Sequence, residues 1–121
     1  MAVRAVRGAT QVEADDREEI IAATAELVRE VLDRNGLTDD DLISILFTTT
    51  PDLVAEFPAY AARTIGITDV PFLCASEIAV PGSMPRVIRL MAFVEASFPR
   101  AEARHVYLRG AQALRTDLPR D

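Results

Sequence analysis

Arginine side chains are the groups in this sequence best suited to bind a small anion. All 13 basic residues are arginines, and none is lysine. A planar guanidinium binds a carboxylate through two parallel hydrogen bonds. Four arginines adjoin apolar or structured positions: Arg7, Arg63, Arg89 and Arg115. Each alone is most simply a surface arginine, but together they could form a local positive pocket for a small polyanion.

The usual catalytic sets are missing from the sequence. Cys74 is the only cysteine and His105 the only histidine, so a nucleophile would depend on that pair unaided. The same counts exclude a disulfide within the chain, a multi-cysteine metal site and a histidine-rich zinc centre. The five glycines are scattered singly, which argues against a phosphate-binding loop. We therefore expect no cofactor and no metal.

Several short motifs, each weak alone, follow one another at a defined spacing. They are Arg4-Ala5-Val6-Arg7-Gly8-Ala9-Thr10, Thr50-Pro51-Asp52-Leu53, Phe57-Pro58-Ala59, Cys74-x-x-Glu77, Ile88-Arg89, Arg104-His105-Val106-Tyr107-Leu108 and Leu114-Arg115. Together they resemble the small monofunctional chorismate mutases of the trimeric α/β-barrel-like class. The resemblance extends from Arg4 to Leu118.

The resemblance implies isomerisation of chorismate to prephenate, an intramolecular Claisen rearrangement. Such a step needs no nucleophile and no metal, which fits the missing catalytic sets. It needs the flexible dicarboxylate held in a compact chair. It also needs cationic donors at the ether oxygen, which gains negative charge as its carbon–oxygen bond breaks. Arginine can do both.

The resemblance assigns catalytic roles to Arg89, Arg7, Glu77 and Tyr107. Arg89 should bond the ether oxygen and one carboxylate, and Arg7 with Tyr107 should hold the carboxylate of the enolpyruvyl group. Glu77 and Cys74 should bond the ring hydroxyl. Without the resemblance, Cys74 reads as a small buried hydrophobe, Tyr107 as a packing aromatic, and Glu77 as a cap for the following loop.

Four further residues are implied to bind substrate. Phe57 should pack on the ring, Leu114 should close the pocket, and Arg63 and Arg115 should attract and cover the dianion. The resemblance also implies a homotrimer with sites between adjacent subunits, in which Phe57 and Arg63 come from the neighbour. Otherwise, Phe57 could simply be a staple for the helix that follows it.

Two positions depart from the family pattern, and one other function stays open. Tyr60 occupies a position where the family usually has a basic residue, which would weaken the attraction of the substrate at the mouth of the site. Leu73 replaces a small polar residue.

A non-catalytic trimeric module that binds small carboxylates, or an imine deaminase of similar fold, is the alternative function. A carboxylate sensor would need the arginines but has no need of Glu77.

The elements that must position these residues follow from hydrophobic periodicity. The sequence predicts strand, helix, strand, helix, strand, helix and strand over residues 2–12, 16–34, 42–49, 57–66, 72–77, 85–98 and 104–109. This order favours an α/β (α+β) fold with a mixed or parallel sheet packed against helices. The resemblance implies a mixed sheet in a chorismate-mutase-like pseudo-barrel trimer. The chain from about residue 110 is expected to be a mobile tail.

Two of these elements bear directly on the site. The predicted helix over 85–98 is apolar almost all round apart from Arg89, which suggests a subunit interface. Cys74 and Glu77 are three residues apart on a strand, so their side chains should point to opposite faces. Either the strand breaks near Ser76, or the two side chains serve the pocket from different subunits.

Length and charge limit the remaining classes. The 121 residues predict a single domain over 1–121, with no room for a second. The net charge of −6 argues against a nucleic-acid or membrane partner. No apolar run approaches the roughly 20 residues that span a bilayer, and the first residues contain no secretory h-region. We therefore expect a cytoplasmic protein.

Overall fold

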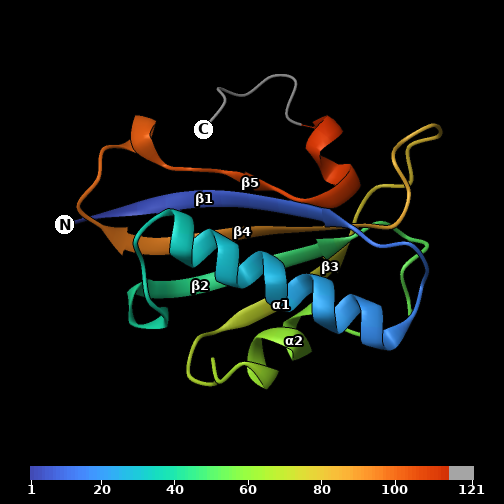
Figure 1. The fold of residues 1–121 in the computed structure, drawn as a ribbon, viewed down its shortest axis with the longest axis horizontal. Helices are drawn as coiled ribbons and strands as arrows, with labels where there is room; N and C mark the ends of the chain where they lie inside the picture. The colour runs from blue at the N-terminus through green and yellow to red at the C-terminus, as the bar shows by residue number, and fades with distance from the viewer. Residues whose placement is uncertain (115–121) are drawn as a thin grey trace.

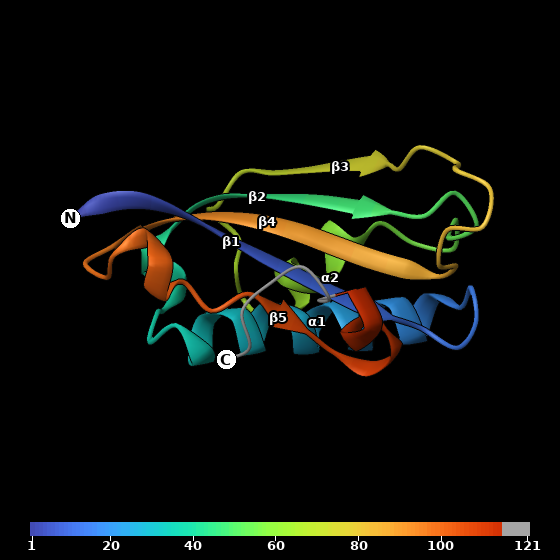
Figure 2. The same cartoon turned by 90° about the horizontal axis from the view of Figure 1, so that it is seen from above.

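Two helices cover one face of a five-stranded mixed β-sheet in the computed structural model, which describes residues 1–114 (Figures 1 and 2). The strands are β1 (Ala2–Gln11), β2 (Leu42–Thr49), β3 (Phe72–Ser76), β4 (Val87–Ala96) and β5 (Val106–Tyr107). The helices are α1 (Arg17–Arg34) and α2 (Pro58–Thr64), with three short 3-10 helices at Asp39–Asp41, Arg100–Glu102 and Arg109–Leu114. Among residues 1–114, none of the helices combines the length and the apolar composition that a membrane span requires.

The order of strands across the sheet is β3-β2-β4-β1-β5. β4 lies at the centre and pairs antiparallel with both β1 and β2. The two outer pairs, β2 with β3 and β1 with β5, are parallel. The predicted mixed sheet packed with helices is confirmed, and the structure adds the order of its strands.

The helix predicted over 85–98 is wrong, because this segment is the central strand β4. Alternate residues Ile88, Leu90, Ala92 and Val94 are buried against the helices. The residues between them point to the opposite face of the sheet. A short run with apolar residues at most positions fits both the two-residue period of a strand and the 3.6-residue period of a helix. Periodicity therefore does not distinguish a buried strand from a helix here. Arg89 consequently projects from a sheet rather than from a helix.

Most other predicted elements are confirmed, and the C-terminal part is corrected. The strand predicted over 104–109 is reduced to Val106–Tyr107. At Arg109 the backbone turns to a φ of 53°, and a 3-10 helix follows to Leu114, with Ala111 buried. Residues 110–114 therefore belong to a 3-10 helix, and the mobility expected from about residue 110 stays a prediction. Arg115, a predicted site residue, lies outside the described residues.

The core lies between the helices and the sheet, and it sets how closely α1 approaches β1. Leu27, Val28 and Val31 of α1 are almost fully buried there. A Cβ atom on Gly8 of β1 would lie 3.1 Å from Leu27 and 3.2 Å from Val31. Glycine at this position therefore lets the helix pack directly on the strand.

No other element within residues 1–114 covers the sheet face turned away from the helices, as Figure 2 shows. We call it the outer face; its apolar members include Val3, Ala5, Leu46, Leu73, Met91 and Phe93. Val3 is 61% exposed and Leu73 67%. Antiparallel sheets that face water on one side usually alternate apolar with polar residues. This face instead carries an apolar surface around its arginines.

Candidate active site

A hollow of about 350 Å³ lies on the outer face, and its lining includes Arg7, Ala9, Arg89, Tyr107 and Leu114. We call it the crevice. The register explains how these residues meet, because Ala9 of β1 is directly opposite Arg89 of β4. Arg7 is two residues from Ala9 and so shares its face, at a diagonal Cα distance of about 7–8 Å from Arg89. Two arginines thus line one hollow.

Tyr107 and Leu114 form the other wall of the crevice. Tyr107 of β5 is the parallel partner of Ala9, so Ala9 lies between Arg89 and Tyr107 in the sheet. Ala9, Tyr107 and Ala111 form a small buried cluster, and Leu114 packs against it. The single methyl group of Ala9 leaves room above β1 for a ligand. The 3-10 helix after β5 brings Leu114 to the edge of this space.

Glu77 follows β3 and reaches the crevice through Arg89. Its carboxylate accepts a hydrogen bond from Thr48 Oγ1 at 2.7 Å and one from Arg89 Nη1 at 3.2 Å. The Glu77 side chain is 17% exposed and that of Arg89 43%. A half-buried carboxylate thus holds the arginine from one side. Thr48, which orients Glu77, did not emerge from the sequence, because its role depends on the pairing of distant strands.

Cys74 and Glu77 lie on opposite faces of the sheet, as the alternation predicts. β3 is regular through Ser76, and the Glu77 N–H continues the ladder with a 2.8 Å bond to the Thr49 carbonyl. The strand therefore does not break near Ser76. Cys74 packs against the core on the helix side of the sheet. Within one chain, these two residues do not meet around a common ligand.

Phe57, Arg63 and Cys74 form a second group at the β3 edge of the sheet. All three line a hollow of about 310 Å³ beside α2. Phe57 is the N-cap residue of α2, and it is 70% exposed. The crevice lining includes none of the three. The structure of one chain thus divides the predicted site residues into the crevice and this group, which we call the flank.

Among residues 1–114, the side chains at the crevice carry more positive than negative charge. Arg89 pairs with Glu77, whereas Arg7 makes no ion pair with any residue in that range. The backbone N–H of Arg7 donates to His105 Nδ1 at 2.9 Å, which ties the segment before β5 to β1. No group of three or more potential ligands for a metal ion occurs in the same range. This arrangement suits a small dianion bound by guanidinium groups.

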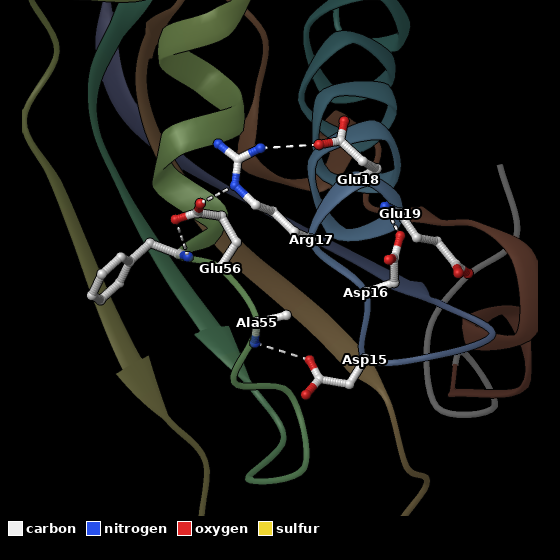
Figure 3. A network of polar contacts seen from close by, with 8 residues as sticks. Asp15, Asp16, Arg17, Glu18, Glu19, Ala55 and Glu56 are labelled. Atoms are coloured by element: carbon white, nitrogen blue, oxygen red, sulfur yellow. Dashed lines mark hydrogen bonds and ion pairs between the residues drawn. The ribbon is translucent and has the colours of Figure 1, made fainter.

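The loop before Phe57 is tied to the start of α1 (Figure 3). Asp15 Oδ1 accepts hydrogen bonds from the backbone N–H groups of Val54 and Ala55, each at 3.0 Å. Arg17 Nε donates to Glu56 Oε2 at 2.8 Å. Glu56 Oε1 in turn accepts from the Phe57 N–H at 2.9 Å. We call these contacts the loop brace.

The Glu56 carboxylate should add stability that disappears in acid. Its pKa lies below the ordinary 4.5, first because of the Phe57 N–H and then because of Arg17. A lowered pKa means that the stabilisation is present above about pH 4.5 and is lost as the pH falls through the lowered value. The difference in free energy of unfolding between the wild type and Glu56→Gln should therefore shrink below about pH 4.5. Denaturant titrations check this, and a difference that grows in acid would contradict it.

Known proteins resemble this chain over nearly its whole length. Residues 3–118 match the family model of chorismate mutase type I. A chorismate mutase AroH of Thermus thermophilus is 50% identical over 117 residues, 96% of each chain. One of Bacillus subtilis is 40% identical over 119 residues, covering 98% of this chain and 94% of the relative. A solved chorismate mutase from Clostridium thermocellum superposes with a TM-score of 0.89 at 47% identity, over 90% of this chain and 97% of that one.

The chain belongs to the chorismate mutase type I family. The resemblance read from the short motifs is thereby confirmed. The roles assigned to individual residues stay predictions, and the geometry described above supports them to different degrees.

Proposed function

We propose that this protein, an isomerase of the chorismate mutase family, converts chorismate to prephenate in the crevice. The observation that carries the proposal is that Arg7 and Arg89 line one hollow together with Tyr107 and Leu114. Two forked cations can hold the two carboxylates of the substrate. The rearrangement breaks a carbon–oxygen bond and forms a carbon–carbon bond in the same molecule. No proton is transferred, so the site needs no general acid or base.

Arg89 is the group we expect at the breaking bond. Its guanidinium is held on one side by Glu77, which leaves its other donors for a ligand in the crevice. A donor that is already oriented stabilises developing charge without the cost of reorganisation. The ether oxygen becomes more negative as its bond breaks, so this interaction strengthens in the transition state. Arg7 and Tyr107 then hold the enolpyruvyl carboxylate across Ala9.

The assembly we propose is a homotrimer in which the crevice of one chain meets the flank of the next. Phe57, Arg63 and Cys74 lie outside the crevice of their own chain, so only another chain can place Phe57 and Arg63 against its ligand. The apolar outer face supplies a surface for that contact, because an uncovered apolar sheet face is otherwise costly. The single domain, the cytoplasmic location, and the lack of a nucleic-acid or membrane partner stay predictions.

A spectrophotometric assay tests the activity. The purified protein should consume chorismate at the same rate with and without a metal chelator. The loss of chorismate absorbance measures this rate. Binding of chorismate without turnover would instead identify a carboxylate-binding module. Loss of activity on chelation would contradict a mechanism based on arginine alone.

Glu77→Ala should lower kcat/KM by about ten- to a hundredfold. The change removes the expected partner of the ring hydroxyl and also frees Arg89. A hydrogen bond to a charged group contributes about 1.5–3 kcal/mol, which sets this range. Steady-state kinetics check it, with Glu102→Ala in the exposed 3-10 helix Arg100–Glu102 as the control. Equal activity of Glu77→Ala and the control would remove Glu77 from the site.

A further inference from the structure

The loop brace holds the one flank residue whose ring is expected to meet the substrate. Phe57 directly precedes α2, and its side chain is 70% exposed, so little packing fixes the ring. Its backbone is nevertheless held: the N–H groups of residues 54, 55 and 57 all donate to carboxylates. Charge-assisted hydrogen bonds of this kind are the stronger ones. The position of the ring therefore depends on groups that are far from the crevice.

Asp15 provides the first link of the brace. It lies just before α1, 39 and 40 residues away in sequence from the two N–H groups that it accepts. A single carboxylate oxygen bonds both groups, which orients two consecutive peptide planes of the loop. Since the next residues are Glu56 and Phe57, this orientation determines where the chain enters α2.

Arg17 provides the second link, from the first turn of α1. It donates to Glu56 at 2.8 Å and to Glu18 at 3.0 Å, and its guanidinium lies 5.2 Å from the centre of the Tyr60 ring. Glu56 and Tyr60 flank the start of α2 on both sides of Phe57. The Glu56 side chain is 18% exposed, against 80% for Glu18. Arg17 thus connects α1 to Glu56, the residue directly before Phe57, whereas its contact with Glu18 is exposed to solvent.

We infer that Asp15 and Arg17 are positioning residues for substrate binding, which act by fixing the angle at which Phe57 is presented to a neighbouring crevice. This inference rests on the proposed function, in which Phe57 packs on the substrate ring. In that scheme the Phe57 side chain packs on the substrate ring and donates no hydrogen bond to the ether oxygen. Loss of the brace should therefore weaken binding more than it slows the chemical step.

Kinetics of five variants test the inference. Arg17→Ala and Asp15→Ala should each raise KM for chorismate about fivefold, which is about 1 kcal/mol, with kcat within about twofold of the wild type. Asp15→Asn keeps an acceptor oxygen and should restore most of the affinity. Glu18→Ala removes the exposed partner of Arg17 and should match the wild type. An unchanged KM in both Arg17→Ala and Asp15→Ala, with Phe57→Ala impaired, would overturn the inference alone.

A double-mutant cycle separates positioning from a general loss of stability. If Arg17 acts through Phe57, Arg17→Ala should have no further effect on KM in the Phe57→Ala background. Full additivity of the two changes would overturn the inference. An unchanged KM in Phe57→Ala itself would refute the place of Phe57 in the proposed function, and the inference with it.

A fluorescence measurement gives a readout that does not depend on activity. The sequence contains no tryptophan, so Phe57→Trp introduces a single indole at the loop. Its anisotropy should fall, and its quenching by acrylamide should rise, when Arg17→Ala or Asp15→Ala is added. Glu18→Ala should leave both values unchanged. Identical signals in all of these backgrounds would show that the brace does not hold Phe57.

Discussion

Replacing Arg89 by alanine should lower kcat by about two to three orders of magnitude, the loss seen when one oxyanion donor is removed. The expected size follows from the role of the side chain, since its bond to the ether oxygen strengthens as charge develops there. Arg89→Lys should remain poor, because an ammonium keeps the charge but not the planar fork that can bond Glu77 and substrate together. Steady-state kinetics with chorismate measure both effects.

The fold should tolerate these changes at Arg89, so the loss can be assigned to catalysis. The side chain is 43% exposed and lines a hollow, and its removal therefore leaves no cavity in the core. Thermal unfolding of both variants should stay close to that of the wild type. Near-normal turnover by Arg89→Ala would remove this residue from the mechanism.

Two impaired variants should regain activity when they are mixed, provided that each site combines two chains. One variant carries Arg89→Ala in the crevice, and the other carries Phe57→Ala with Arg63→Ala in the flank. In a hybrid trimer with sites between neighbours, one site of three pairs an intact crevice with an intact flank. Random reassortment makes three quarters of the trimers hybrid, so about a quarter of the wild-type rate should return.

The two variants are unfolded and refolded together so that their chains reassort. As a control, each variant is unfolded and refolded alone, and its residual activity sets the baseline. The flank variant should retain less than about a tenth of the wild-type kcat/KM, because it lacks both a ring contact and a cation. A mixture that shows only the average of its two parents would mean that each site is built within one chain.

Local patterns predicted much of the secondary structure, and β4 shows where they fail. The spacing of hydrophobic residues is unambiguous over β1, α1 and β2. The predicted bounds of each of these elements are close to the observed ones. The run from Val87 to Ala96 is apolar on both faces, because one face packs on helices and the other belongs to the apolar outer face. Only the pairing of β4 with two distant strands selects a strand there, and that pairing is a non-local property.

The candidate site divides in the same way between local and non-local information. The motifs supplied the residues Arg7, Arg89, Tyr107 and Leu114, but their meeting depends on the register of Ala9 with both β4 and β5. The contacts of Thr48 with Glu77, and of Arg17 with Glu56, join segments 29 and 39 residues apart. No spacing in the sequence indicates such pairs. The separation of the crevice from the flank likewise appears only once the strands are in place.

A crystal structure with prephenate bound would test the central claim most directly, because that claim concerns where the two carboxylates lie. We expect one carboxylate within hydrogen-bond distance of Arg89 and the other at Arg7 and Tyr107, with the ring against Phe57 of an adjacent chain. Prephenate bound elsewhere, with the crevice between Arg7 and Arg89 left to solvent, would contradict it.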